Sequence, residues 1–253
     1  MKALILAAGR GTRLASLTNG RPKILMPVCG VPMLERLLAG LGRGGIIDVA
    51  INTHHLAEQV SAHVERIADR FPELNIRLFH EPELLGTGGA IANLGDYRDQ
   101  SPLLVWNGDV LADCSAHALF VLHFDTEALA TLVVKEREDA SQLLIDGEGT
   151  LCGIDSPARG GRRTVREPEG ELRSVGFCGI SILAPEFCAR FDKPGAFDLL
   201  DALLDVAADG GTIGTLDLRR GFWGTSGSPE ELSQLEKELN GRPETLVRFT
   251  PER

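Results

Sequence analysis

The chain has 253 residues, 43% of them hydrophobic and 25% charged, which is sufficient for one large α/β domain with a substantial core. The formal net charge of -10 excludes a generic nucleic-acid or anionic-membrane surface, because both need a basic face. We find no secretory signal, no apolar run near the roughly 20 residues of a spanning helix, and no C-x-x-C pair among the five cysteines. We therefore expect a cytoplasmic protein with free thiols that binds neither nucleic acid nor membrane.

The first half of the chain alternates strand and helix signals. Short apolar runs predict strands over residues 4–7, 46–51, 76–80 and 103–106. Helical signals predict helices over residues 32–38, 56–70 and 88–94. This alternation predicts a parallel sheet with helices on both faces, whose ligands bind beyond the carboxyl ends of the strands.

The second half is more mixed. It is predicted to hold strands over 130–135, 176–183 and 212–218, a hairpin over 143–154, an exposed loop over 160–163, and a helix over 196–208. A last helix is expected to begin after Ser228 as N-cap. We expect a single domain over residues 1–240, with a nucleotide-binding half (1–110) and a sugar-binding half (111–240), followed by a polar tail over 241–253.

A glycine-rich loop with cations follows the first strand. Glycines let backbone N–H groups approach phosphate oxygens, and arginine and lysine neutralise their charge. The dinucleotide fingerprint fails here because Leu14 occupies the position of its third glycine, and no P-loop motif is present. The loop therefore predicts a polyphosphate site, with candidate residues Ala8, Gly9, Gly11, Thr12, Arg13 and Lys23.

The pattern Gly9-x-Gly11-Thr12-Arg13, Pro22-Lys23 and Met26-Pro27-Val28-x-Gly30-x-Pro32 resembles the opening of the sugar-1-phosphate nucleotidyltransferases, or sugar nucleotide pyrophosphorylases. Ser16 stands where the family usually has proline. The resemblance implies a Rossmann-like, mostly parallel sheet sandwiched by helices. It also implies the reaction: a nucleoside triphosphate and a sugar 1-phosphate give a nucleoside-diphosphate sugar and pyrophosphate. The compact length is most similar to the short bacterial members that act on N-acetylmuramate, mannose or heptose 1-phosphates.

The resemblance assigns catalytic roles to Arg13, Lys23 and Asp109. Asp109 in the Gly-Asp pair after the fourth strand would bind Mg²⁺, while Lys23 and Arg13 would contact the phosphates. The family's second metal-binding aspartate is expected in the segment beginning at Trp223, but Thr225 stands at that position. A hydroxyl is a much poorer Mg²⁺ ligand than a carboxylate.

The resemblance also assigns base and sugar contacts. Glu81, Gly86 and Thr87 lie in a segment similar to the family's base-reading motif, in which Glu81 would accept the imide N–H of uracil or guanine. Sugar contacts are expected from Asn107, Gly176 and Arg166.

Three functions remain open on the sequence. The first is an NDP-sugar-forming enzyme of the cell-envelope type, a monomer or homodimer using UTP or GTP with Mg²⁺. The second is a catalytically impaired nucleotide-sugar-binding or regulatory homologue, suggested by Thr225. The third is a related transferase acting on another phosphate acceptor, such as an alcohol phosphate or a pterin cofactor.

Overall fold

The computed structural model describes residues 1–253 apart from 15–17, 19, 192–194, 220 and 252–253, so that Ser16 lies outside it. The described residues form two compact units. Unit 1 combines residues 1–84, 106–116 and 222–253, and unit 2 combines 85–105 and 117–221. These bounds differ from the division expected at residue 110, because the chain returns to unit 1 twice.

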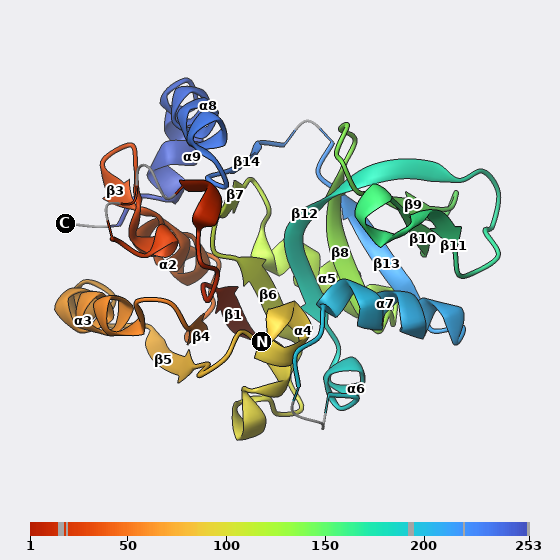
Figure 1. The fold of residues 1–253 in the computed structure, drawn as a ribbon, viewed down its shortest axis with the longest axis horizontal. Helices are drawn as coiled ribbons and strands as arrows, with labels where there is room; N and C mark the ends of the chain where they lie inside the picture. The colour runs from red at the N-terminus through yellow and green to blue at the C-terminus, as the bar shows by residue number, and fades with distance from the viewer. Residues whose placement is uncertain (15–17, 19, 192–194, 220, 252–253) are drawn as a thin grey trace. The chain divides into compact units, whose positions relative to one another are not determined.

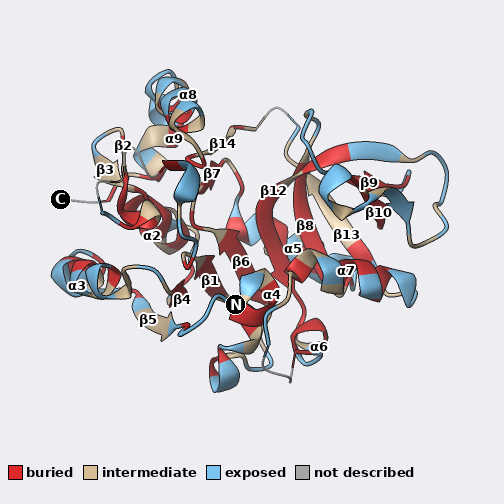
Figure 2. Ribbon diagram, in the orientation of Figure 1, coloured by how far each residue is buried: buried red, intermediate tan, exposed pale blue. Residues whose placement is uncertain are grey.

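Unit 1 is built on parallel strands (Figure 1). Strand β1 (Lys2–Leu6) pairs with β4 (Asp48–Thr53), and β4 pairs with β5 (Asn75–His80), each in parallel. The last residues of β6 (Leu103–Asn107) also belong to this unit. The three central residues of β1 are fully buried, as expected for a parallel strand covered on both faces (Figure 2).

Two amphipathic helices accompany these strands, α2 (Met33–Arg43) and α3 (Ala57–Ile67). Short elements occupy the segments between them: η1 (Thr12–Leu14), η2 (Lys23–Leu25), β2 (Pro27–Val28), β3 (Val31–Pro32) and η3 (Ala68–Arg70). A two-stranded ladder of β7 (Val110–Ala112) and β14 (Trp223–Thr225) brings distant segments together. Helix α8 (Pro229–Asn240) begins as predicted, since the Ser228 hydroxyl accepts the Glu231 N–H at 3.2 Å.

The segment expected to be a polar tail instead holds helix α9 (Pro243–Arg248). Phe249 directly after it is buried, and the buried guanidinium of Arg36 donates to its carbonyl oxygen at 3.1 Å. Charged residues and threonines outnumber the apolar residues in this segment, so the two anchoring residues Thr245 and Phe249 gave too weak a signal.

Unit 2 holds a mixed sheet. Strand β12 (Arg173–Leu183) pairs in antiparallel fashion with β8 (Ala130–Lys135) and β9 (Gln142–Ile145), and β13 (Ile213–Asp217) pairs with β8 in parallel. The predicted hairpin is confirmed as β9 and β10 (Leu151–Ser156). Its turn is closed by Asp146, whose carboxylate accepts the N–H groups of Glu148 and Thr150.

One prediction for unit 2 is wrong. Residues expected to form an exposed loop form the edge strand β11 (Gly161–Thr164), paired with β10. Its single glycine and two arginines suit a solvent-facing edge, where backbone pairing rather than side-chain burial holds the strand.

The remaining elements of unit 2 are mainly helical: α4 (Gly86–Ala92), η4 (Gly95–Tyr97), α5 (Ala116–Asp125, in unit 2 from residue 117), η5 (Pro157–Arg159), α6 (Pro185–Cys188) and α7 (Leu199–Ala208). The expected α/β class is confirmed, with antiparallel strands added in unit 2. Among the described residues, no helix has the length and apolar character needed to cross a membrane.

Candidate functional site

In the loop after β1, several backbone N–H groups have no hydrogen-bond acceptor among the described residues. Gly11 has a φ of +61°, and its carbonyl accepts the Leu14 N–H at 2.9 Å as the chain turns into η1. The N–H groups of Gly9, Arg10 and Gly11 donate to no acceptor among the residues that the structure describes. A run of open amides in a glycine turn can form a concave anion site, so phosphate binding by this loop stays a prediction.

The cation and the carboxylate expected at the reacting centre meet in unit 1. Lys23 begins η2, Asp109 follows β6, and the Lys23 Nζ forms an ion pair with Asp109 Oδ2. Both side chains keep limited solvent access, 16% for Lys23 and 23% for Asp109. A Cβ on Gly11 would lie 3.1 Å from Lys23 Cβ, so the lysine stem packs directly against the loop.

Gly108 makes this meeting possible. Its N–H donates to the Leu6 carbonyl at 2.9 Å, and a Cβ at this position would lie 2.6 Å from that oxygen and 2.6 Å from Ile24 Cδ1. Real Cβ atoms essentially never approach so closely. The glycine therefore lets the end of β6 pass against the end of β1, and Asp109 emerges beside Lys23. Asn107, a sugar-binding candidate, is half-buried at the same strand end.

The C-terminal motif lies against Asp109. The Ser226 N–H donates to the Asp109 carbonyl at 2.8 Å, and Thr225 pairs with Val110 across the β14–β7 ladder. The structure thus places Thr225 next to the metal-binding candidate, as the resemblance implies. The buried Ser226 was missed by the sequence analysis, and its position within the altered motif was the available signal.

Two arginines that flank Lys23 in the sequence, Arg13 and Arg21, lie in different places in the structure. Arg13 is exposed, and a Cβ on Gly227 would lie 3.4 Å from its Nη2, so Arg13 lies at the Ser226-Gly227 turn. Arg21 instead lines a cavity of about 460 Å³ together with His63 and Arg66 of α3. Arg21 therefore faces α3 rather than forming part of the Lys23–Asp109 pair.

Glu81 is fully buried, with 0% exposure, directly after β5. Its Oε1 accepts the Asn52 Nδ2–H at 2.7 Å, and Asn52 Oδ1 accepts the Ala7 N–H at 2.6 Å. The sequence analysis missed Asn52, although a polar residue near the end of a buried apolar strand was a usable signal. A carboxylate with no exposed surface is not presented to a base, so a direct base contact by Glu81 remains only a prediction.

Gly86 and Thr87 lie in unit 2, where their segment has a structural partner. The N–H groups of Gly88 and Gly89 both donate to the Phe197 carbonyl, and a Cβ on Gly86 would lie 2.5 Å from that same oxygen. The Thr87 hydroxyl accepts the Leu199 N–H at 2.8 Å. The glycines of this motif therefore pack against the segment that leads into α7, and the Gly88 and Gly89 amides of α4 already have a backbone acceptor.

The two remaining sugar candidates also have protein partners within unit 2. Gly176 of β12 pairs with Lys135 of β8. The side chains of Arg137 and Asp139 pack so closely over Gly176 that a Cβ built there would overlap them. Arg166 donates to the Gly211 carbonyl at 3.2 Å. A sugar-phosphate role for either residue stays a prediction.

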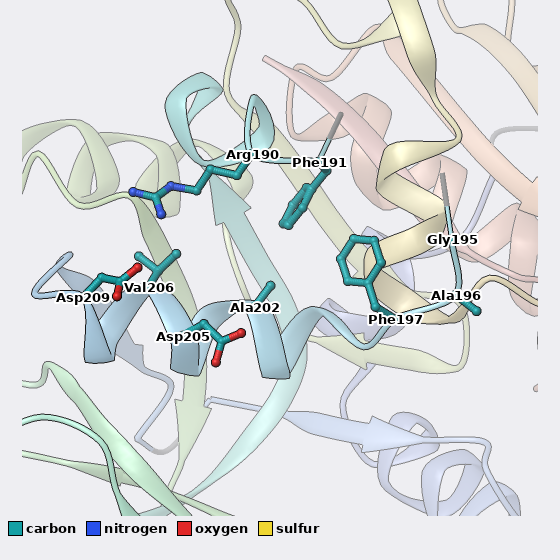
Figure 3. A pocket seen from close by; sticks show the side chains of 9 residues that line it. All are labelled: Arg190, Phe191, Gly195, Ala196, Phe197, Ala202, Asp205, Val206 and Asp209. Atoms are coloured by element: carbon teal, nitrogen blue, oxygen red, sulfur yellow. The ribbon is translucent and has the colours of Figure 1, made fainter. Parts of the chain in front are cut away.

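Unit 2 also contains a pocket of about 370 Å³ beside α7 (Figure 3). The rings of Phe191 and Phe197 lie 5.2 Å apart on its lining, while the carboxylates of Asp205 and Asp209 line another part. Two carboxylates disfavour a phosphate ligand here.

Magnesium fits the unit 1 site with a single protein ligand. Mg²⁺ is usually held by one or two carboxylates together with substrate phosphates and water. Asp109 supplies one partly exposed carboxylate. No group of three or more His, Cys, Asp or Glu side chains that could hold a metal is found in the described part of the chain. A site completed by phosphate oxygens is consistent with both observations.

The chain is an α/β protein in which the glycine loop follows the carboxyl end of the parallel strand β1. The family model described as "Nucleotidyl transferase" matches residues 2–143, more than half of the chain. The chain therefore belongs to the nucleotidyl transferase family, and the resemblance seen in its sequence is confirmed.

Curated relatives are similar over most of this chain. N-acetylmuramate alpha-1-phosphate uridylyltransferase from Caulobacter vibrioides is 29% identical over 94% of this chain and 96% of its own length. Mannose-1-phosphate guanylyltransferase catalytic subunit beta from Danio rerio is 28% identical over 91% of this chain. The chain spans only 62% of the length of that second relative.

Solved structures share the fold. HddC from Yersinia pseudotuberculosis superposes with a TM-score of 0.74 at 22% identity, covering 94% of this chain and 99% of its own. Apo-UDP-glucose pyrophosphorylase gives a TM-score of 0.75 at 16% identity, covering 96% and 99%. HddC has also been solved in complex with GMP-PN.

Proposed function

We propose that this protein joins a nucleoside triphosphate to a sugar 1-phosphate, forming a nucleoside-diphosphate sugar and releasing pyrophosphate. A single observation carries the proposal: the Lys23–Asp109 pair lies against a glycine loop whose N–H groups at Gly9, Arg10 and Gly11 have no acceptor among the described residues. The relatives named for uridylyl and guanylyl transfer to sugar 1-phosphates support the same reaction class.

In this reaction a phosphate oxygen of the sugar 1-phosphate attacks the α-phosphorus of the triphosphate. One P–O bond forms, the bond to the β-phosphate oxygen breaks, and pyrophosphate leaves with its electron pair. The protein needs no covalent intermediate, because catalysis of phosphoryl transfer is mainly positioning and charge neutralisation. The loop amides and Arg13 would hold the β- and γ-phosphates, and Lys23 would neutralise charge at the α-phosphate.

We propose Mg²⁺ as the cofactor, held by Asp109 together with phosphate oxygens. When bound, the ion supplies positive charge that offsets the phosphates. Because Lys23 pairs with Asp109, the lysine lies beside the carboxylate that would hold the ion and its phosphate ligands.

The test is pyrophosphate release measured with each nucleoside triphosphate and a panel of sugar 1-phosphates. We expect turnover with UTP or GTP and with an N-acetylmuramate, mannose or heptose 1-phosphate, and a loss of at least about 100-fold for Lys23→Ala. Arg21→Ala serves as a matched cation control, since Arg21 faces α3 instead. No pyrophosphate release with any pair of substrates would overturn the proposal.

Thr225 favours a second candidate, a nucleotide-sugar-binding protein with impaired catalysis. Thr225 pairs with Val110, the residue after Asp109, and the resemblance implies a carboxylate at this position. Triphosphate binding by the wild-type protein without turnover, together with turnover appearing in Thr225→Asp, would select this candidate. Turnover by the wild-type protein selects the enzyme.

Two finer expectations belong to the same proposal. We place the enzyme in the cytoplasm, a reducing compartment that suits its five free cysteines. Its product would be a sugar nucleotide used in building the cell envelope. We also propose a monomer or homodimer, which sedimentation equilibrium distinguishes.

A further inference from the structure

Asn52 joins two segments that the sequence alone assigned to the nucleotide. It is the fifth residue of β4 and is almost completely buried, with an exposed fraction of 3%. On one side it accepts the Ala7 N–H at 2.6 Å, at the point where β1 opens into the glycine loop. On the other side it donates to Glu81 Oε1 at 2.7 Å.

The chemistry of the neighbours fixes which way the Asn52 amide points. A backbone N–H such as that of Ala7 only donates, so it must meet the Asn52 oxygen, which leaves the Asn52 nitrogen to donate to Glu81 Oε1. The Asn52 nitrogen must therefore face Glu81 and its oxygen must face Ala7. Glu81 is itself held by its backbone, since its N–H donates to the Thr53 carbonyl at 2.7 Å and its carbonyl lies 2.8 Å from His54 Nδ1.

We propose that Asn52 is a positioning residue for the triphosphate, oriented by Glu81, and that Glu81 acts through Asn52 rather than on the base. Glu81 sets the direction of the Asn52 amide, Asn52 fixes the Ala7 peptide, and that peptide sets the direction of the amides that follow. The inference deepens the proposed function and rests on it for the identity of the ligand.

The sharpest test exchanges donor and acceptor between the two side chains. Asn52→Asp keeps an acceptor for Ala7 but places one carboxylate against another, so we expect triphosphate affinity to fall at least about tenfold. Adding Glu81→Gln supplies an amide that donates to the carboxylate introduced at position 52, and the double variant should bind within about threefold of the wild type. Glu81→Gln alone tests the base directly, because its preference between UTP and GTP should match that of the wild type if Glu81 does not read the base.

The measurements are the Kd for UTP and for GTP by calorimetry, the unfolding temperature, and hydrogen exchange at the Ala7 amide. We expect the Ala7 amide to exchange faster in Asn52→Ala than in the wild type, and to be protected again in the double variant. Ser61→Ala, on the surface of α3, is a control that should change neither affinity nor exchange.

Three results would overturn the inference. These are unchanged affinity and Ala7 exchange in Asn52→Ala, a failure of the double variant to regain what Asn52→Asp loses, or a changed preference between base types in Glu81→Gln alone. The last result would mean that Glu81 reads the base directly. If the wild type binds no triphosphate, the proposed function fails, whereas the exchange measurement still tests the link from Glu81 through Asn52 to Ala7.

Discussion

At the scale of single residues, Gly108 decides whether the candidate site can form. The end of β6 passes so close to β1 that a Cβ built on Gly108 would lie 2.6 Å from the Leu6 carbonyl oxygen and 2.6 Å from Ile24 Cδ1. The site therefore has no room for a methyl group. One of these neighbours is backbone, which cannot rotate away. The glycine is therefore a packing requirement in addition to a turn residue.

Gly108→Ala should lower the free energy of unfolding by about 2–3 kcal/mol, because relief of the overlap must shift a buried strand. It should also reduce pyrophosphate release, since the shift separates Asp109 from Lys23. Chemical denaturation checks the first effect. Gly195→Ala is the control, because a Cβ built there meets no atom within 4 Å in the described residues beyond Gly195 and its chain neighbours. Equal stability of the two variants would contradict the packing argument.

Asp109→Asn removes the charge beside Lys23 while keeping the shape of the side chain. We expect turnover to fall by about 100-fold or more, because a neutral amide neither offsets Lys23 nor suits Mg²⁺. Stability should change by less than about 1 kcal/mol, since the pair is partly exposed. Steady-state kinetics and denaturation measured together separate the two effects. Asp69→Asn, exposed on η3, is the matched control, and an active Asp109→Asn enzyme would contradict the assignment.

Residue identity predicted this site in part. Gly9, Gly11, Lys23 and Asp109 are recognisable because glycine and charged residues in that order have few other uses at a strand end. Asn52 was missed because its partners are 45 and 29 residues away, and no local spacing reveals such a bond. Glu81 was recognised as important, but its complete burial depends on packing that a sequence pattern does not contain.

At the scale of elements, α2 anchors the C-terminal helix α9. The Arg36 guanidinium is 1% exposed and donates to the carbonyl oxygens of Val28, Cys29 and Phe249. Arg43, at the end of the same helix, donates to the carbonyls of Val247, Arg248 and Thr250. Two arginines thus hold the C-terminal carbonyls that an isolated short helix would leave unpaired.

Arg36→Lys should destabilise unit 1 by about 2–3 kcal/mol, because a lysine cannot reproduce the planar fork and leaves buried carbonyls unpaired. We expect faster proteolysis near α9 and a lower unfolding temperature. Arg162→Lys, exposed on β11, is the matched control. A variant as stable as that control would show that the Arg36 hydrogen bonds do not hold α9.

Elements with strong local signals were predicted well, and those defined by partners were not. Strand β8 has the predicted bounds because it is a continuous apolar run, and the hairpin turn at Asp146 follows from turn chemistry. The edge strand β11 and helix α5 were missed. The first has no buried face, and the second is apolar around its circumference, so neither shows a clear period.

At the scale of the whole molecule, the two units could not be read from the sequence, because each is assembled from separated segments. Residues 106–116 and 222–253 join unit 1 through the β7–β14 ladder and α8, and no composition change marks where they do so. Each unit nevertheless has its own buried core, and each core includes a buried histidine, His63 in unit 1 and His123 in unit 2.

Burial lowers the pKa of both histidines below their ordinary value of 6.5, and the carboxylate of Glu35 offsets part of this shift at His63. Because the unfolded chain then binds protons that the folded chain does not, stability should fall as the pH drops below about 6.5, by at most about 1.4 kcal/mol per pH unit for each histidine. The free energy of unfolding measured by urea denaturation between pH 8 and pH 5 checks this. The double variant His63→Gln/His123→Gln keeps hydrogen-bonding groups toward Glu35 and Thr131 but removes both titrating imidazoles. Its free energy of unfolding should therefore depend less on pH than that of the wild type. His117→Gln, outside both cores, is the control, and parallel profiles for all three proteins would contradict the assignment.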